Sequence, residues 1–402
     1  MPIKAGPLEN IVVLELGSLI AAPFASRLLA DFGARVIKVE PLGGDPLRQW
    51  GVQHEELKTS YWSLVQSRNK ELLAIDLRKP QGASLVGELA KAADIVIENF
   101  RPGRLKEWGI GYEQLKEKNP NLIMVSISGY GQSGPYRDRP GFGNIAESMG
   151  GLRAVTGYPD GEPLRVGVSL GDQVASLYAV IGALLALWNR KNGGAGNHVD
   201  VALTEAVFSL TEAALTEYAV AGIVPERTGN RLHRAAPSGV YPTQEGGWVA
   251  IGANSDSIFA RFARAIDHSD WLDDSSLCTN AGRVDRADWL EERIAEWTQQ
   301  HTLTEIMEVL VDAQVPAGPI YTIEDIAQDP HFIARGAITT GLVTGTGEEI
   351  VMPGIFPKLL ENPGHIRFTH PQVGHDTVRI LSDLLGKSPD EIDALQKRGV
   401  IK

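Results

Sequence analysis

The sequence contains one cysteine, Cys278, among 402 residues, so it has no second thiol for an intrachain disulfide. This usage fits a reducing compartment. The longest apolar run, residues 174–188, has 15 residues, fewer than the roughly 20 that a membrane-spanning helix needs. Residues 1–6 lack the apolar core of a signal peptide. We therefore expect a cytoplasmic protein in which the apolar run is a helix buried in a large domain.

Basic residues are too few for a nucleic-acid partner. The chain has 38 Lys and Arg against 50 Asp and Glu, a net charge of −12, and no long basic segment. A phosphate backbone would be repelled on average. The nine histidines show no H-E-x-x-H or clustered Cys/His spacing, and no G-x-S-x-G elbow occurs. The sequence therefore predicts no bound metal and does not indicate an α/β-hydrolase.

A dinucleotide fingerprint is present only in a weak form. Residues 141–146 read GFGNIA, which matches G-x-G-x-x-A, but they follow the polar segment 137–140 and not a strand. The first strand-to-helix turn, residues 16–23, lacks the glycines that cradle phosphates. Glu40 does end the second strand, where a ribose-binding acid would lie. A nicotinamide or flavin dehydrogenase is not favoured, because the phosphate-binding glycines are missing.

Strands and helices alternate along the first half of the chain. Strands are predicted at residues 11–16, 35–39, 72–77, 94–98, 122–126 and 198–203, with helices at 22–32, 80–91 and 174–188. This alternation predicts a parallel α/β sheet whose ligands lie beyond the carboxyl ends of its strands.

The length and a change in composition predict more than one domain. A chain of this length exceeds what one simple core holds, and Gly, Pro and Arg become frequent from about residue 227. We expect a large α/β domain at residues 1–225 and a small α+β domain at 226–330. The C-terminal segment, residues 331–402, is expected to return to the large domain.

Asp172 stands between a glycine-containing turn, residues 167–171, and the apolar helix that follows. A carboxylate at this place has two interpretations. It caps the helix by accepting hydrogen bonds from the free N–H groups of the first turn, or it is a nucleophile that attacks an activated acyl group in a dry site. The position alone leaves both interpretations open.

A glycine-rich loop and three arginines occur at the same predicted edge of the sheet. The loop, residues 128–134, follows the fifth predicted strand and is placed to form a wall over a ligand. Arg78 follows the third strand, and Arg101 and Arg104 follow the fourth. Singly, these arginines are typical of solvated surface charges. Together they put guanidinium groups where phosphates could be held.

An ordered set of segments resembles the class III coenzyme A transferases, the family of formyl-CoA transferase and the carnitine CoA-transferases. The segments are VLEL at 13–16, FGARVIKVE at 32–40, IDL at 75–77, ENFRPG at 98–103, SGYG at 128–131, GD at 171–172, VDVA at 199–202 and PQVGH at 371–375. The resemblance implies a Rossmann-like large domain, a small α+β domain and a homodimer of interlocked chains. It also implies that Asp172 is the catalytic residue, a nucleophile that forms a covalent anhydride and then an aspartyl-CoA thioester.

The resemblance further implies contacts with coenzyme A from four parts of the sequence. They are Ser18, Leu19 and Ile20; Ile75 and Arg78; Asn99, Phe100, Arg101 and Arg104; and Arg139 and Phe142. Formyl-CoA transferase has a glutamine in place of Ile20, so its formyl and oxalate specificity is not expected here. It has an arginine in place of Pro41, so the contacts with the adenine or the phosphates are expected to differ. No cofactor is implied beyond coenzyme A as co-substrate.

An arginine-rich segment, residues 227–234, offers a place for the acid that accepts CoA. Arg231, His233 and Arg234 could bind the far carboxylate of a dicarboxylic acid. With the family resemblance, this predicts transfer of CoA from succinyl-CoA to a C4–C6 dicarboxylate or hydroxydicarboxylate.

Two alternatives stay open. An α-methylacyl-CoA racemase has a similar fold, but it pairs its aspartate with a histidine where this chain has Phe142, which cannot carry a proton. The other alternative is a non-catalytic CoA-binding protein, against which an intact Asp172 argues.

Overall fold

A computed structural model describes residues 6–402. The expectation that the chain starts without a signal peptide concerns Met1 to Ala5, which lie outside the described residues. The chain divides into two compact units. The first runs to Leu152, resumes over Val166–Leu215 and ends with Ile333–Lys402. The second consists of Arg153–Arg165 and Thr216–Phe332.

These boundaries differ from the predicted ones in two places. Residues 153–165 and 216–225 go with the second unit, although a single boundary near 225 was expected. Arg227 explains the first difference, because its guanidinium group donates to the carbonyl oxygens of Tyr158, Pro159 and Gly161. Contacts over such a sequence distance leave no mark in composition or periodicity.

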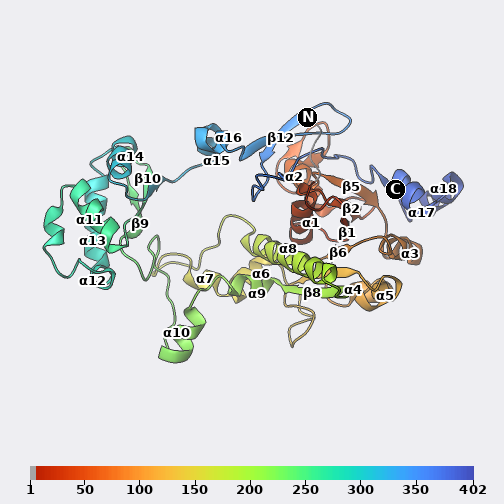
Figure 1. Cartoon of the computed structure of the whole chain (residues 1–402), viewed down its shortest axis with the longest axis horizontal. Helices are drawn as coiled ribbons and strands as arrows, with labels where there is room; N and C mark the ends of the chain where they lie inside the picture. The colour runs from red at the N-terminus through yellow and green to blue at the C-terminus, as the bar shows by residue number, and fades with distance from the viewer. Residues whose placement is uncertain (1–5) are drawn as a thin grey trace. The chain divides into compact units, whose positions relative to one another are not determined.

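A six-stranded parallel sheet forms the centre of the first unit (Figure 1). Its strands are β1 (Val12–Glu15), β2 (Arg35–Glu40), β5 (Lys70–Ala74), β6 (Ile95–Glu98), β7 (Ile123–Ser128) and β8 (Asn197–Ala202), in the order β5-β2-β1-β6-β7-β8. From β1, the next strands along the chain, β2 and β5, are added toward one edge of the sheet. From β6, the strands β7 and β8 are added toward the opposite edge, so the strand order reverses between β1 and β6. Ligands of open α/β sheets bind beyond the carboxyl ends of the strands at such a reversal. The loops after β1 and β6 are therefore the place to look for a site.

Helices cover both faces of this sheet. One face packs against α1 (Ala21–Asp31), α8 (Leu170–Lys191) and α9 (Leu203–Phe208). The other packs against α3 (Pro80–Leu89), α4 (Arg104–Glu107), α5 (Tyr112–Lys118), α17 (Thr377–Leu385) and α18 (Pro389–Lys397). Strand residues point alternately to the two cores, Val13 to the first and Leu14 to the second. Each fully buried Val, Leu or Ile side chain contributes about 1.5–3 kcal/mol, so both layers are held firmly in place.

Helix α8 begins earlier than predicted. Its first residue is Leu170 and its N-cap is Ser169, so Asp172 lies inside the first turn. The interpretation of Asp172 as the N-cap is therefore wrong. The reason is that Leu170 and Gly171 already adopt the helical backbone conformation, whereas the glycine at 171 was interpreted as part of the preceding turn. An acid in the first turn still interacts favourably with the helix dipole.

The outer face of α8 is apolar and exposed. Its inner face is lined by alanines, including Ala175, Ala179 and Ala183, which let α1 approach closely. Its outer face carries a stripe of large side chains, Leu177, Ile181, Leu185 and Trp188, which are 48–64% exposed. The prediction of a buried helix thus holds for one face only. Among residues 6–402, α8 is the one helix long and apolar enough to cross a membrane, a test that core helices of soluble proteins also pass.

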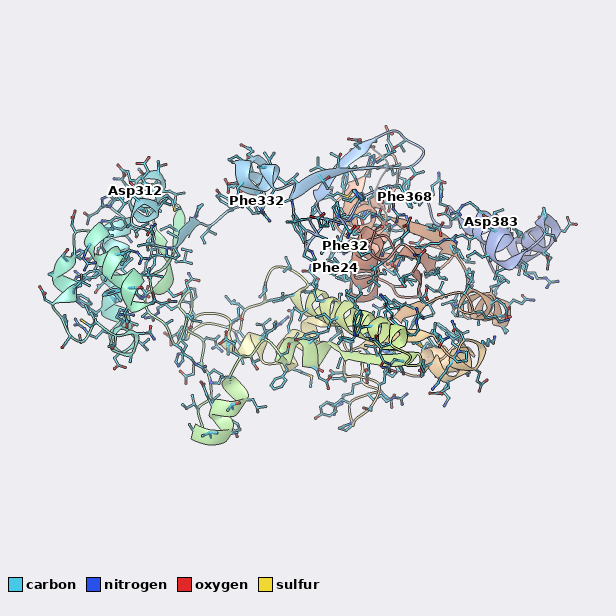
Figure 2. The ribbon with its side chains drawn as sticks, viewed as in Figure 1. Phe24, Phe32, Asp312, Phe332, Phe368 and Asp383 are labelled. Atoms are coloured by element: carbon cyan, nitrogen blue, oxygen red, sulfur yellow. The ribbon has the colours of Figure 1, made fainter. Side chains whose placement is uncertain are left out.

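The C-terminal segment covers the edge strand of the sheet. Figure 2 shows Phe368 on this segment, and its carbonyl oxygen accepts from the N–H of Asn69 at the start of β5. Further along β5, the N–H of Leu72 donates to the Asp376 carboxylate, and the N–H of Asp376 donates to the Leu72 carbonyl. Ile401 forms an isolated β-bridge with Ile75 just past the strand. The backbone groups of β5 that face away from β2 are therefore paired.

The second unit has its own small sheet and core. Its antiparallel strands are β9 (Ser238–Pro242), β10 (Trp248–Gly252) and β11 (Ala317–Pro319), in the order β11-β10-β9. They pack with α11 (Asp256–Ala265), α13 (Ala287–Thr298) and α14 (Leu303–Asp312), whose apolar faces are buried. An α+β arrangement results.

An arginine organises the core of the second unit. Arg283 is 0% exposed. Its guanidinium group donates to three backbone carbonyl oxygens, pairs with Asp256, and lies 4.7 Å from the centre of the Phe259 ring. A buried guanidinium of this kind is tolerated because nearly all of its donors find partners.

The remaining elements complete the two units. They are the 3₁₀ helices η1 (Pro46–Gln49) and η2 (Ser269–Leu272), the strands β3 (Gln53–His54), β4 (Thr59–Ser60), β12 (Ile338–Leu342) and β13 (Glu349–Pro353), and the helices α2 (Tyr61–Gln66), α6 (Gly143–Met149), α7 (Leu152–Val155), α10 (Ala214–Ala221), α12 (Asn280–Asp285), α15 (Ile323–Gln328) and α16 (Pro330–Ala334).

Candidate functional site

The loops after β1 and β6 meet at the reversal of strand order. In the first loop, residues 17–20, the N–H of Ser18 donates to the Asn99 side-chain oxygen at 2.9 Å. The Asn99 side-chain nitrogen donates in turn to the Ser18 carbonyl oxygen at 2.9 Å. Two predicted coenzyme-binding segments are thereby joined by a pair of hydrogen bonds. The structure brings together Ser18 and Asn99, which lie 81 positions apart.

The first loop is also held from the side of β2. The N–H of Leu19 donates to both oxygens of Asp45, at 3.0 and 3.2 Å. Asp45 pairs with Lys38, and the Lys38 ammonium group also reaches Glu15 and the Gly17 carbonyl oxygen. Burial would lower the pKa of Lys38, but Asp45 and Glu15 raise it above its ordinary value. Lys38 is therefore a buried cation.

Asp172 lies against a glycine backbone. A Cβ atom built on Gly143, the first residue of α6, would lie 2.2 Å from Asp172 Oδ2 and 2.7 Å from Asp172 Cγ. Only glycine therefore leaves room for the carboxylate in this position. One turn along α8, the Ser176 hydroxyl lies 2.6 Å from the Asp172 carbonyl oxygen and 2.7 Å from the carbonyl oxygen of Ala21. This contact fixes the start of α8 beside the end of the first loop.

The glycine-rich loop packs next to the same segment. A Cβ atom on Gly129 would lie 3.1 Å from the Cα of Gly141, so the two backbones are in close contact. The Tyr130 hydroxyl reaches Met149 at the end of α6. The glycine-rich loop, predicted to form a wall over a ligand, therefore contacts Gly141, two residues before the Gly143 that lies against Asp172.

A cavity of about 310 Å³ opens beyond β6 and β7, lined by the side chains of Arg101, Lys106 and Arg137. We call it the basic cavity; its floor includes Glu98, Ser126, Tyr112 and His198. Arg101 and Lys106 form no ion pair with any of the residues that the structure describes. Arg137 pairs with its neighbour Asp138 at 3.3 Å. The basic cavity is therefore suited to a negatively charged group.

A row of polar side chains crosses three strands under the basic cavity. Glu98 on β6 is in register with Ser126 on β7, and Ser126 with Asp200 on β8. Burial raises the pKa of the Glu98 carboxyl to about 7, and Asp200 adds to the rise. Burial also lowers the pKa of His198, whose Nε2 lies 2.9 Å from the Ser126 hydroxyl. Glu98 therefore changes charge near neutral pH.

The other residues predicted to bind coenzyme A are spread along the carboxyl edge of the sheet. Ile20 and Ile75 are buried, and Phe100 is half-buried, with its ring 5.2 Å from Trp108 edge to face. Three of the exposed residues have local partners: Arg78 pairs with Asp76, Arg104 pairs with Glu107, and Arg139 lies over the ring of Tyr136. Phe142, the residue before α6, is 67% exposed. Of the four arginines predicted to bind coenzyme A, Arg101 alone lines the basic cavity.

The residues predicted to bind the acid substrate lie in the second unit. Arg231 and His233 line a cavity of about 250 Å³. Arg231 pairs with Asp288, which lines the same cavity, and Arg234 pairs with Glu217. All three predicted residues are exposed. The two arginines thus already have carboxylate partners, which a substrate carboxylate would have to replace.

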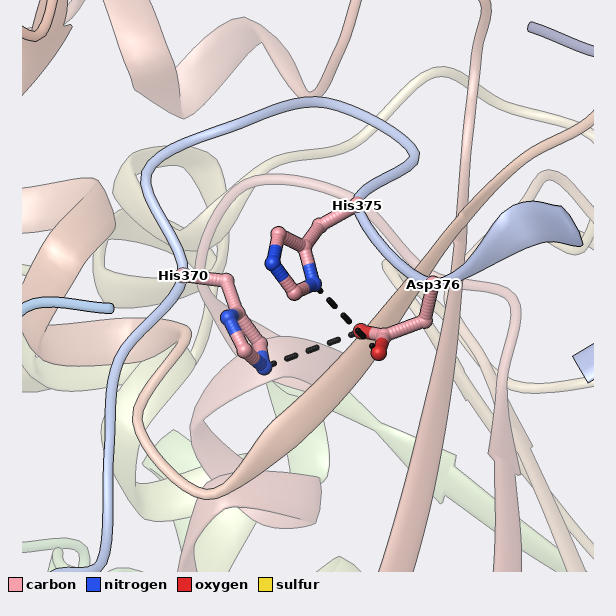
Figure 3. A group of neighbouring side chains, drawn as sticks. All are labelled: His370, His375 and Asp376. Atoms are coloured by element: carbon pink, nitrogen blue, oxygen red, sulfur yellow. Dashed lines mark ion pairs between the residues drawn. The ribbon is translucent and has the colours of Figure 1, made fainter. Parts of the chain in front are cut away.

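One group of side chains has the composition of a metal site. The ligand atoms of His370, His375 and Asp376 lie within 4.8 Å of one another (Figure 3). The two imidazole rings are stacked at 4.0 Å with an angle of 20°, so their in-plane lone pairs lie in nearly parallel planes. Both Asp376 oxygens also accept hydrogen bonds, from Leu72 and Arg379. This geometry suits the anchoring of the C-terminal segment to β5 better than coordination of an ion.

Several residues of the site were not identified from the sequence. Asp45 and Lys38 were missed, although a lysine within the apolar strand 35–39 indicates a buried partner. Glu98 was quoted only as part of a segment. Gly143 gave no sequence signal of its own, because its role depends on the approach of a residue 29 positions away.

Chemically, the site offers a half-buried carboxylate at the N-terminal end of a long helix. Asp172 lies in the first turn of the 22-residue helix α8, where the N–H of Leu170 donates to the Val168 carbonyl oxygen and the N–H of Gly171 to the Glu147 carboxylate. The positive end of the helix dipole stabilises negative charge that develops on a bound carbonyl oxygen. The first loop and the basic cavity lie at the same edge of the sheet. The arrangement suits attack by a carboxylate on an acyl group held by an anionic carrier.

Comparison with known proteins gives a consistent result. The model of CoA-transferase family III matches residues 8–377. The chain is 46% identical over 396 residues to the succinyl-CoA–D-citramalate CoA-transferase of Chloroflexus aurantiacus, and the match covers 98% of each chain. It is 39% identical over 398 residues to the beta subunit of succinyl-CoA–L-malate CoA-transferase from the same organism, again over 98% of each chain. A solved CAIB/BAIF family protein from Brucella suis is similar with a TM-score of 0.83 and 32% identity, over 95% of this chain and 100% of that one.

Proposed function

The chain belongs to CoA-transferase family III, and from this premise we propose that it transfers CoA from succinyl-CoA to a free C4–C6 dicarboxylate or hydroxydicarboxylate. The position of Asp172, pressed against Gly143 in the first turn of α8, supports the proposal most directly. The names of the relatives support the substrates, because one uses D-citramalate and another uses L-malate. Both acids are hydroxydicarboxylates.

In the proposed mechanism Asp172 is a covalent nucleophile. One carboxylate oxygen attacks the thioester carbonyl of succinyl-CoA, the C–S bond breaks, and a mixed anhydride and CoA thiolate result. The thiolate attacks the Asp172 carbonyl carbon, which releases succinate and leaves an aspartyl-CoA thioester. The acceptor carboxylate attacks this thioester and expels the thiolate, forming a second anhydride. The thiolate then attacks the acceptor carbonyl carbon, which gives the new acyl-CoA and restores the Asp172 carboxylate.

The surroundings of Asp172 suit these steps. Each tetrahedral intermediate places negative charge on a carbonyl oxygen, and the positive end of the α8 helix dipole can stabilise this charge. Every covalent intermediate is labile to water, so the glycine-rich loop at 128–134 is proposed to limit access of solvent. No metal or redox group takes part in any step.

For coenzyme A, we propose contacts along the carboxyl edge of the sheet. The first loop and Asn99 would hold the part near the thioester, because they lie beside the start of α8. Arg101, with Lys106 and Arg137, would hold phosphate groups in the basic cavity. Arg78, Arg104 and Arg139 are exposed, so exchanging their present partners for phosphate oxygens costs little. Ile75, Phe100 and Phe142 would supply apolar contacts.

The binding of acyl-CoA should depend on the charge of Glu98. Its pKa of about 7 means that the carboxyl becomes negative as pH rises from 6 to 8. A negative charge under the basic cavity opposes a bound phosphate, so KM for succinyl-CoA should rise several-fold over this range. Glu98→Gln should remove this rise. Glu113→Gln, at the exposed rim of the same cavity, is the matched control and should leave the pH slope as in the unchanged protein. A slope retained in Glu98→Gln would contradict the assignment.

Recognition of the acceptor should depend on Arg231 and Arg234. Their combined replacement by alanine should raise KM for the dicarboxylate at least about ten-fold, because charge-assisted hydrogen bonds to carboxylate are lost. KM for succinyl-CoA should stay the same. Stability should change little, since the ion pairs with Asp288 and Glu217 are exposed. Arg264→Ala, another exposed arginine of the second unit, is the control. If the double variant kept the KM of the unchanged protein for the dicarboxylate, this proposal would be contradicted.

The overall function is tested by a screen for CoA exchange. Purified protein is incubated with a panel of acyl-CoAs and free acids, and products are identified by mass spectrometry. Exchange between succinyl-CoA and a hydroxydicarboxylate is the expected result. Deuterium uptake at the α-carbon without exchange would favour a racemase instead. Binding of CoA without either reaction would favour a non-catalytic protein.

We also propose that the protein is a cytoplasmic homodimer. The exposed apolar stripe on α8, with Leu185 and Trp188 both more than 60% exposed, supports this assembly, because monomers seldom leave so much apolar surface open. The interlocked form is implied by the family resemblance. Light scattering at micromolar concentration should give twice the mass of 43.5 kDa, and a stable, active monomer would contradict the proposal.

A further inference from the structure

We propose that Asp45, supported by Lys38, is a positioning residue that fixes the first loop in the conformation that receives the coenzyme. The proposal rests on the proposed function, since it concerns the same coenzyme site. Asp45 is not proposed to contact the thioester or Asp172. It acts through the backbone of Leu19.

The conformation of Leu19 is the first observation. Its φ angle is +66°, in the left-handed region that residues with a Cβ atom avoid. The N–H of Leu19 donates to both oxygens of the Asp45 carboxylate. A charged acceptor bound in this way stabilises a backbone conformation that leucine would otherwise leave.

The burial of the pair is the second observation. Asp45 is 4% exposed and Lys38 is 3% exposed, and their charged atoms lie 2.8 Å apart. Burial would raise the pKa of the Asp45 carboxyl, but Lys38 holds the pKa below its ordinary value. Asp45 therefore stays charged. Glu15 and Lys70, also buried, complete a set of two carboxylates and two ammonium groups.

The third observation is that three successive residues of the loop are held by buried or half-buried side chains. Lys38 donates to the Gly17 carbonyl oxygen, Asn99 pairs with both backbone groups of Ser18, and Asp45 accepts from Leu19. Ile20, the next residue, precedes α1. So many polar contacts on one short loop at the reversal of strand order indicate a preorganised binding surface.

Asp45 has a second contact that supplies the competing explanation. Its Oδ1 also accepts from the N–H of Leu47, which caps the short helix η1. If capping were its whole role, replacing Asp45 would lower stability without a specific effect on coenzyme binding. The two roles differ in their dependence on Leu19, because only the positioning role requires the left-handed conformation at that residue.

A double-mutant cycle with glycine at position 19 separates these roles. Free coenzyme A is titrated calorimetrically into the full-length protein and into its Asp45→Ala, Leu19→Gly and doubly substituted variants. We expect Asp45→Ala to weaken binding about 5- to 30-fold in the leucine background. The same change should weaken it less than about 3-fold in the glycine background, because glycine adopts positive φ without strain. KM for succinyl-CoA should rise with little change in kcat.

A conservative variant provides the safeguard against loss of folding. Asp45→Asn keeps one acceptor oxygen for Leu19 and should lie between the unchanged protein and Asp45→Ala in coenzyme affinity. Thermal unfolding is measured for each variant. If Asp45→Ala does not fold, the cycle is run with Asp45→Asn. An equal loss of affinity in both backgrounds, or none in either, would overturn the proposal.

The unchanged protein and Asp172→Ala are assayed for CoA transfer alongside. Transfer that persists without the Asp172 carboxylate speaks against the proposed function. Coenzyme affinities that are independent of Asp45 speak against the positioning role alone.

Discussion

Replacement of Asp172 by alanine is expected to lower kcat for CoA transfer on the order of 10⁴-fold or more, the range seen when a covalent nucleophile is removed. The reason is that Asp172 supplies the carboxylate that lies against Gly143 in the first turn of α8. The measurement is the rate of CoA exchange between succinyl-CoA and its acceptor. The binding of coenzyme A should persist, because the first loop and the basic cavity are unchanged.

Chemical trapping gives an independent readout of the same prediction. In the presence of acyl-CoA, hydroxylamine or borohydride should modify Asp172 in the unchanged protein, and peptide mapping should locate the change. Asp172→Asn serves as the isosteric control for folding. Full activity in the alanine variant, or trapping at another carboxylate, would overturn the covalent mechanism.

Gly143→Ala should be the second most damaging change. The new Cβ atom would lie 2.2 Å from Asp172 Oδ2, far inside contact distance, so the carboxylate has to move. A displacement of about 1 Å of a reacting group costs on the order of 10²-fold in rate. We therefore expect kcat to fall by about that factor while the thermal stability is nearly kept, since alanine is favoured over glycine within a helix.

The matched control is Gly87→Ala, the same change in helix α3 of the same unit. There the new Cβ atom would lie 3.2 Å from Lys118 Nζ, the flexible end of a side chain, and 3.8 Å from Ile110 Cγ2, an ordinary contact distance. Activity should be unaffected. If Gly143→Ala were as active as this control, Asp172 would not depend on the close approach that the structure shows.

The sequence predicted the layout of the sheet because strand signals are local. Five of its six strands lie within about two residues of the predicted bounds, whereas β5 ends at Ala74 and not at Leu77. Ile75 continues the apolar run but pairs with Ile401, a partner 326 positions away. Periodicity cannot reveal such a partner. The same limitation explains why the outer face of α8 was expected to be buried.

The candidate site was predicted only in part, since charge patterns do not show which cations are already paired. Arg101 does line a cavity with two further basic residues. Arg231 and Arg234 were singled out from charge alone, yet the structure pairs them with Asp288 and Glu217. Asp45 and Gly143 act through distances to residues remote in sequence. Their roles depend on distances in the folded structure, and these distances cannot be derived from the spacing of residues along the sequence.

The covering of β5 by the C-terminal segment has a consequence for biosynthesis. The sheet is encoded before residue 203, but the groups that close its edge, at Phe368, Asp376 and Ile401, are made last. During translation the backbone groups at the outer edge of β5 therefore stay unpaired until the C-terminal segment is made. Strands with such an exposed edge can pair wrongly with other chains. The second unit is complete before those residues emerge. We expect the ribosome-bound chain to fold its inserted unit first, and to need protection by a chaperone until the final segment closes the sheet.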